Sequence, residues 1–114
     1  MFLKKKGKNI MYLPKEGKLV RDKIPQIIGK NADVQVLSNE NMLNALLLKL
    51  VEEAKEAQAT TNVKDLTGEL ADVFEVLEHI QKHANITNEA VYKEKQTKNL
   101  IRGSFYKKFW LNTW

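Results

Sequence analysis

Two neighbouring segments repeat their apolar residues at intervals of three and four positions, which is the spacing of one helix face. The first segment follows Ser38 and covers residues 39–59, and the second follows Asn62 and ends near residue 83. Ser and Asn are good helix N-caps, so each segment has a defined start. The apolar stripes consist of Leu43, Leu46, Leu47, Leu50, Ala54 and Ala57 in the first segment and Leu66, Leu70, Val73, Phe74, Leu77 and Ile80 in the second. The short connection between them favours an antiparallel hairpin, so the sequence predicts an all-α fold.

Two further helices are predicted outside the hairpin. A short helix is expected from Pro25 to about Gly29, because proline suits the first turn of a helix. A largely polar helix follows the N-cap Thr87, covers residues 88–101 and ends before Gly103. The remaining tail, SFYKKFWLNTW, is aromatic and basic. We expect the tail to pack on its own core or on a partner chain, with stacking on a nucleobase as the alternative.

The length of 114 residues indicates a single domain, which we place at residues 15–114. Residues 1–14 are expected to form a flexible amino-terminal extension, with Met11 as an alternative start. The largely polar helix at residues 88–101 cannot bury the apolar stripes of the hairpin by itself. We therefore expect a homodimer, or a higher homo-oligomer, with a four-helix bundle at its centre and terminal segments that contact the neighbouring subunit.

The composition restricts the location and the partners of the protein. Cysteine is absent, which excludes disulfides and thiolate metal sites and fits a cytoplasmic location. No apolar run reaches the ~18 residues that a membrane span requires, so no membrane partner is expected. The net charge of +5 indicates an anionic partner, either a polyphosphate nucleotide or a nucleic acid.

Each hairpin helix carries two acidic residues three positions apart, and such residues lie on the same face. The pairs are Glu53 with Glu56 and Glu69 with Asp72, and both flank the apolar stripe of their helix. If the stripes pack antiparallel, the carboxylates meet at the rim of the interface, where they repel one another and lose hydration. A divalent cation removes this cost, and Mg²⁺ prefers carboxylate oxygens, waters and substrate phosphates as ligands. The spacing therefore predicts a metal site for a phosphorylated ligand, with a solvated acidic surface as the alternative.

Three segments resemble a known family. EEAKE, followed after twelve residues by ELAD, resembles the E-E-x-x-E…E-x-x-D signature of the all-α nucleoside triphosphate pyrophosphohydrolases, the MazG-like superfamily. KLVRDKIPQII at residues 18–28 looks like the amino-terminal signature of the phosphoribosyl-ATP pyrophosphohydrolase-like subgroup, and KNLIRGSF at residues 98–105 resembles its carboxy-terminal K-x-x-x-R-G-G-F. The chain has Gln26 where the subgroup usually has Glu, and Ser104 where it has a second Gly. Neither departure touches the four paired acids.

The resemblance implies Mg²⁺-dependent hydrolysis of a ribo- or deoxyribonucleoside triphosphate between its α and β phosphates, giving a monophosphate and pyrophosphate. Clearing unwanted nucleotides would be the cellular role. The resemblance also implies that Glu53, Glu56, Glu69 and Asp72 hold Mg²⁺, with Mn²⁺ as an alternative ion. Glu52, Glu53 and Glu56 are the expected catalytic acids, and we expect Glu53 or Glu56 to deprotonate the attacking water. Glu52 is expected to orient water or a basic side chain instead of binding metal.

Basic side chains are expected to bind the phosphates that the metal leaves free. Arg21, Lys98 and Arg102 are the strongest candidates because they lie inside the family-like segments. Asp22 is expected either to anchor Arg21 or to cap the helix near Pro25. The full set of expected phosphate-binding residues is Arg21, Lys23, Lys98, Arg102 and Lys107.

Two other functions remain open at this stage. The subgroup label suggests phosphoribosyl-ATP hydrolysis in histidine biosynthesis. The positive charge suggests a nucleotide- or nucleic-acid-binding regulator without catalysis. A regulator that only binds nucleotides or nucleic acids does not require four convergent acids. We therefore expect a nucleoside triphosphate as the partner, and we do not expect nucleic acid.

Overall fold

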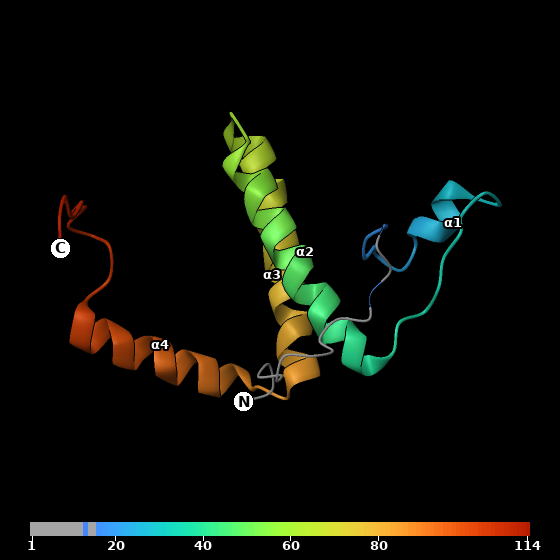
Figure 1. Ribbon diagram of the computed structural model, residues 1–114. Helices are drawn as coiled ribbons and strands as arrows, with labels where there is room; N and C mark the ends of the chain where they lie inside the picture. Colours follow the sequence, from blue (N-terminus) through green and yellow to red (C-terminus); the bar gives the residue numbers. More distant parts are fainter. Residues whose placement is uncertain (1–12, 14–15) are drawn as a thin grey trace.

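The computed structural model describes residue 13 and residues 16–114, and the fold of this part of the chain is all-helical (Figure 1). Its helices are α1 (Ile24–Ile28), α2 (Asn39–Gln58), α3 (Val63–Ala84) and α4 (Asn88–Arg102), without a strand between residues 16 and 114. The all-α prediction is confirmed, and each predicted helix is found within two residues of its expected bounds. The expected amino-terminal extension, residues 1–14, lies outside the described residues apart from Leu13.

Three of the helices start at side-chain caps that the sequence predicts. The side chains of Ser38, Asn62 and Thr87 each accept a hydrogen bond from the backbone N–H three residues further on, at 3.1, 2.8 and 3.1 Å respectively. Each bond satisfies one of the free N–H groups in the first turn of its helix. The helix bounds are therefore set by local chemistry, which is why periodicity and caps predict them.

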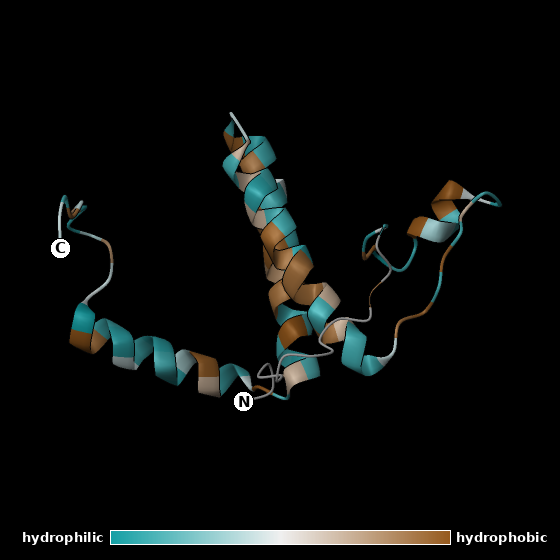
Figure 2. Ribbon diagram, in the orientation of Figure 1, coloured by the Kyte–Doolittle hydropathy of each residue, from teal (hydrophilic) through white to brown (hydrophobic). Residues whose placement is uncertain are grey.

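Helices α2 and α3 form an antiparallel hairpin, and this is the one extensive helix-to-helix contact between residues 16 and 114. Its buried apolar residues are Ala45, Leu46 and Val76. Other members of the predicted stripes remain open to solvent, including Leu70 at 44% and Phe74 at 69% exposure. Figure 2 shows the apolar residues running along both helices. The stripes are thus wider than one neighbouring helix can cover.

Helix α4 leaves the hairpin and extends away from it (Figure 1). Two features define the junction between α3 and α4. Asn85 adopts the left-handed conformation with φ 59°, and Gln81 Nε2 donates a hydrogen bond to Asn88 Oδ1 at 2.8 Å. All residues from Asn85 to Trp114 are exposed, so the expectation that the tail packs on its own core is wrong for the single chain. A helix that could span a membrane is not found among residues 16–114.

The segment before α1 runs beside the hairpin and brings two basic residues to it. Lys18 contacts Glu52 of α2, and Arg21 contacts Asp72 of α3. Neither expected role of Asp22 matches this arrangement, because Arg21 pairs with Asp72 and α1 has no side-chain cap. The segment before α1 thus lies against the side of the hairpin that carries Glu52 and Asp72.

Candidate metal centre

The hairpin brings acidic residues of α2 and α3 together on one side. Glu53 and Glu69 stand eight residues before and after Thr61, so an antiparallel hairpin places them opposite each other. Asp72 lies one turn beyond Glu69 on the same face of α3. Each of the three residues offers one carboxylate oxygen, and these oxygens lie within 4.8 Å of one another. We call Glu53, Glu69 and Asp72 the carboxylate cluster.

Glu53 is the most buried member of the carboxylate cluster, with only 6% of the residue exposed. Its Oε2 lies 3.4 Å from Lys49 Nζ, whereas its Oε1 has no hydrogen-bond partner. Glu69 also has a buried Oε1 without a partner. A buried carboxylate oxygen without a partner is costly, and a bound cation would satisfy it. The donor set of three carboxylates suits a hard divalent ion such as Mg²⁺ or Mn²⁺.

The raised pKa of Glu69 also favours a cation bound at the carboxylate cluster. Loss of hydration raises the pKa of its carboxyl above the ordinary value of 4.5, and interactions with Glu53, Glu56 and Asp72 raise it further. Both causes disfavour the charged form of the carboxyl. A divalent ion reverses this balance because it attracts the ionised carboxylates.

The other two predicted acids occupy different positions. Glu52 points toward basic side chains, with its Oε2 3.2 Å from Lys49 Nζ and 3.7 Å from Lys18 Nζ. Glu56 is exposed and is not part of the carboxylate cluster. The structure therefore brings together three of the four predicted metal ligands, with Glu56 beside them.

An open depression adjoins the carboxylate cluster and extends toward the turn of the hairpin. It is lined by Glu56, Ala59, Thr60, Lys64, Asp65, Gly68, Glu69 and Asp72. Gly68 has open space where a Cβ would lie, so no side chain of α3 fills the depression at this position. A ligand in the depression would contact the cluster on one side and Lys64 on the other.

Two basic residues that the sequence analysis missed, Lys49 and Lys64, belong to this region. Loss of hydration lowers the pKa of Lys49, but hydrogen bonds and charge from Glu52 and Glu53 outweigh it, so the net pKa is raised. Lys49 is therefore a firmly charged partner of these acids. Its spacing of three and four residues from Glu52 and Glu53 is a signal that could have identified it.

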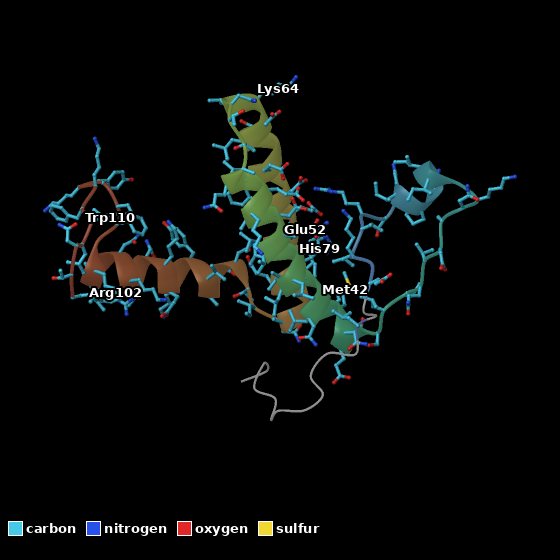
Figure 3. The ribbon with its side chains drawn as sticks, turned by 45° about the horizontal axis from the view of Figure 1, so that its top comes forward. Met42, Glu52, Lys64, His79, Arg102 and Trp110 are labelled. Atoms are coloured by element: carbon cyan, nitrogen blue, oxygen red, sulfur yellow. The ribbon has the colours of Figure 1, made fainter. Side chains whose placement is uncertain are left out.

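The predicted phosphate-binding residues divide into two groups. Arg21 lies at the carboxylate cluster, with its Nη2 2.6 Å from Asp72 Oδ1. Lys23 is exposed at the start of α1, and Lys98 and Arg102 are exposed on α4. Lys107 lies in the tail, with its Nζ 6.0 Å from the centre of the Phe109 ring. Figure 3 shows Arg102 and Trp110 well away from Glu52 and Lys64 of the hairpin.

Comparisons with protein-family models, with curated proteins and with solved structures find no match to the chain. The candidate site is therefore interpreted from its own geometry and from the resemblance of its short segments.

Proposed function

We propose that the protein is a Mg²⁺-dependent nucleoside triphosphate pyrophosphohydrolase of the MazG-like type. The observation that carries the proposal is the carboxylate cluster, in which two neighbouring helices bring three acids within 4.8 Å. Two of these acids have a buried oxygen that no protein group satisfies. The resemblance of EEAKE and ELAD to the MazG-like signature supports the same assignment.

The residues of the carboxylate cluster would hold the ion, and Glu56 lies where its carboxylate can extend the ligand set. When bound, Mg²⁺ neutralises phosphate charge and makes the phosphorus easier to attack. Lys49 contacts the buried Glu53 at 3.4 Å and so holds its carboxylate in place beside the other two acids. The phosphates would lie in the open depression, between the cluster and Lys64.

The reaction requires a base that takes a proton from the attacking water. Glu56 is the better placed of the two expected bases because it is exposed and lines the depression, whereas Glu53 is buried and paired with Lys49. The water oxygen forms a bond to the α phosphorus, and the bond to the bridging oxygen of the β phosphate breaks. The products are a nucleoside monophosphate and pyrophosphate.

A homodimer is part of this proposal. The hairpin alone buries only Ala45, Leu46 and Val76 as apolar residues, a core too small to offset the entropy of ordering the chain. Val51, Leu70 and Phe74 remain 44–69% exposed on α2 and α3. A second hairpin packed on this apolar surface would complete a four-helix bundle. A second copy is the natural occupant because it is present whenever the protein is made.

The test is a product assay with a panel of ribo- and deoxyribonucleoside triphosphates and phosphoribosyl-ATP in Mg²⁺. The proposal expects a monophosphate and pyrophosphate in equal amounts from at least one member of the panel. Release of orthophosphate, or no turnover of any member, would contradict it. Turnover of phosphoribosyl-ATP alone would assign the protein to histidine biosynthesis.

A regulator that binds nucleotides or nucleic acids without catalysis is the second candidate. The exposed aromatic and basic residues of the tail favour it, since Phe105, Phe109 and Trp110 are more than 80% exposed beside Lys107 and Lys108. This candidate expects tight, salt-dependent binding to single-stranded DNA or RNA and no release of pyrophosphate.

A further inference from the structure

Gly68 lies inside helix α3, where glycine is, apart from proline, the least favourable residue. The backbone does not require a glycine here, because Gly68 does not adopt a positive φ. Packing does not require it either, because a Cβ at Gly68 would meet no atom within 4 Å. The described part of the chain therefore gives no reason of its own for a glycine at this position.

Gly68 faces the open depression beside the carboxylate cluster. The depression extends along α3 from Asp72 to Lys64, a span of roughly 12 Å, and Gly68 lies halfway between them. Figure 3 shows Lys64 near the turn of the hairpin and Glu52 further from it. A ligand that extends from the carboxylate cluster toward the turn passes over Gly68, and a side chain there would take up part of its space.

The cation nearest to the turn is also available to a ligand. Lys64 is exposed, lines the depression and makes no ion pair with any residue between 16 and 114. The basic residues on the other side of the carboxylate cluster differ in this respect. Lys18 and Lys49 contact Glu52, and Arg21 contacts Asp72. The free positive charge of the described site thus lies at the turn end of the depression.

Asp65 is the acid next to Lys64, and it has a different partner. Its Oδ2 accepts a hydrogen bond from Asn62 Nδ2 at 2.9 Å, and its backbone N–H donates to Asn62 Oδ1 at 2.8 Å. Its carboxylate lies in the first turn of α3, where the positive end of the helix dipole offsets negative charge. Asp65 therefore leaves the ammonium group of Lys64 free.

These features give a bound triphosphate a direction. The bond that is cut, between the α and β phosphates, has to lie at the carboxylate cluster. The β and γ phosphates then continue either toward the segment before α1 or toward the turn. The first direction leads to basic side chains that are already paired with acids. The second leads over the space at Gly68 to the free Lys64, so it suits an elongated anion better.

We propose that Gly68 and Lys64 form a subsite for the β and γ phosphates, in which Gly68 provides the space and Lys64 contacts the γ phosphate. The inference depends on the proposed function of the carboxylate cluster. It makes the protein selective for nucleoside triphosphates over diphosphates, because a diphosphate bound at the cluster stops short of Lys64. The nucleoside then lies outside the depression.

Substitution of Gly68 tests the space, with an effect on stability opposite to the effect on binding. In EDTA, Gly68→Ala should raise the Tm by about 2–6 °C, because alanine favours the helix and its Cβ has room. With Mg²⁺, the same variant should bind inorganic tripolyphosphate roughly tenfold more weakly in calorimetry. Gly68→Leu has a longer side chain and should bind it more weakly still.

Thr67→Ala is the matched control for this series. It also raises helix propensity, but Thr67 does not line the depression, so tripolyphosphate affinity should equal that of the wild type. Wild-type affinity in Gly68→Leu, or a wild type that does not bind tripolyphosphate with Mg²⁺, would overturn the inference. Analytical ultracentrifugation checks the oligomeric state. A Gly68→Ala variant that dissociates would assign the space to a partner chain and would also overturn it.

Substitution of Lys64 tests the charge. For the nucleotide that is turned over best, kcat/KM of the triphosphate is compared with that of the matching diphosphate, or with its inhibition constant where it is not hydrolysed. Lys64→Ala should weaken the triphosphate roughly tenfold and leave the diphosphate nearly unchanged. Lys82→Ala removes an exposed lysine near the other end of α3 and should have no effect.

The outcomes separate the inference from the function on which it depends. An active wild type whose selectivity is unchanged in Lys64→Ala would overturn the inference and leave the function intact. An effect of Lys64→Ala that varies with the base, and not with the number of phosphates, would place the nucleoside in the depression and overturn it as well. A wild type that releases no pyrophosphate would contradict the proposed function, whereas calorimetry with tripolyphosphate still decides the subsite.

Discussion

The guanidinium Nη2 of Arg21 lies 2.6 Å from Oδ1 of Asp72, although 51 residues separate them in the sequence. This ion pair joins the amino-terminal segment to the carboxylate cluster. A metal ion at the cluster would compete with the Arg21 guanidinium for the same carboxylate. Arg21 is therefore suited to contact either Asp72 or, in the proposed function, a phosphate of the nucleotide.

Replacing Arg21 with glutamine should have opposite effects on metal and on substrate. Without nucleotide, Mg²⁺ affinity should rise by up to about fivefold, because an exposed ion pair of this kind is worth ~1 kcal/mol or less. The KM for the nucleotide should increase, because a phosphate contact is lost. Calorimetry measures the first effect and steady-state kinetics the second. Lys23→Gln is the control, and an equal rise in Mg²⁺ affinity in both variants would contradict the specific role of Arg21.

The Glu53→Gln variant should remain folded and lose turnover. Glu53 is the buried member of the carboxylate cluster, and Lys49 retains Glu52 as a partner in the variant. The loss of activity should exceed the ~10- to 100-fold typical of residues that only support a metal ligand. Circular dichroism checks the fold, and pyrophosphate release measures the rate. A folded variant with wild-type activity would show that Glu53 does not bind the metal.

The contribution of Glu69 to stability should depend on pH. Loss of hydration and the neighbouring acids raise its pKa in the folded protein above the value of 4.5 expected in the unfolded chain. The protonated form therefore stabilises the fold fully below the unfolded pKa, and this contribution is lost as pH rises through the folded pKa. In EDTA, the free energy of unfolding of the wild type relative to Glu69→Gln should fall as pH rises from 4.5 through the raised pKa of the folded protein.

Chemical denaturation of both proteins at several pH values measures this difference. Mg²⁺ should stabilise the wild type increasingly over the same pH range, since ionised carboxylates bind the ion. A difference that grows in favour of the wild type as pH rises in EDTA would contradict the account.

A charged residue at Phe74 should weaken the proposed dimer. Phe74 is 69% exposed in the single chain, and burial of such a side chain in an interface stabilises by about 1.5–3 kcal/mol. The Phe74→Glu variant should dissociate at concentrations at which the wild type is dimeric, as measured by analytical ultracentrifugation. Val36→Glu is the matched control, because Val36 is 98% exposed and lies in the loop before α2. Unchanged dimers in the Phe74 variant would place the interface elsewhere.

The helices and their caps could be predicted because both depend on residues close together in the sequence. Ser38, Asn62 and Thr87 cap helices at the predicted positions, and the short turn between α2 and α3 forces their acids to approach each other. Spacing could not predict which acids converge most closely. Glu53 and Glu56 point about 60° apart around α2, and only Glu53 joins the carboxylate cluster.

Contacts between distant segments could not be predicted from spacing. The approach of Arg21 to Asp72 depends on the path of the chain before α1, and the direction of α4 depends on the left-handed Asn85. Basic residues grouped as one phosphate-binding set in the sequence therefore lie in two places. Arg21 is at the carboxylate cluster, whereas Lys98 and Arg102 are on α4.

The central claim is that the acids of two adjacent helices support magnesium-dependent cleavage between the α and β phosphates. Product analysis in ¹⁸O-labelled water tests it most directly, with Mg²⁺ or EDTA and with the wild type or the Glu69→Gln variant. The account predicts that the wild type with Mg²⁺ releases pyrophosphate and places the label in the monophosphate, and that chelation or the substitution abolishes both. Label in orthophosphate or in pyrophosphate, or equal turnover in EDTA, would contradict the account.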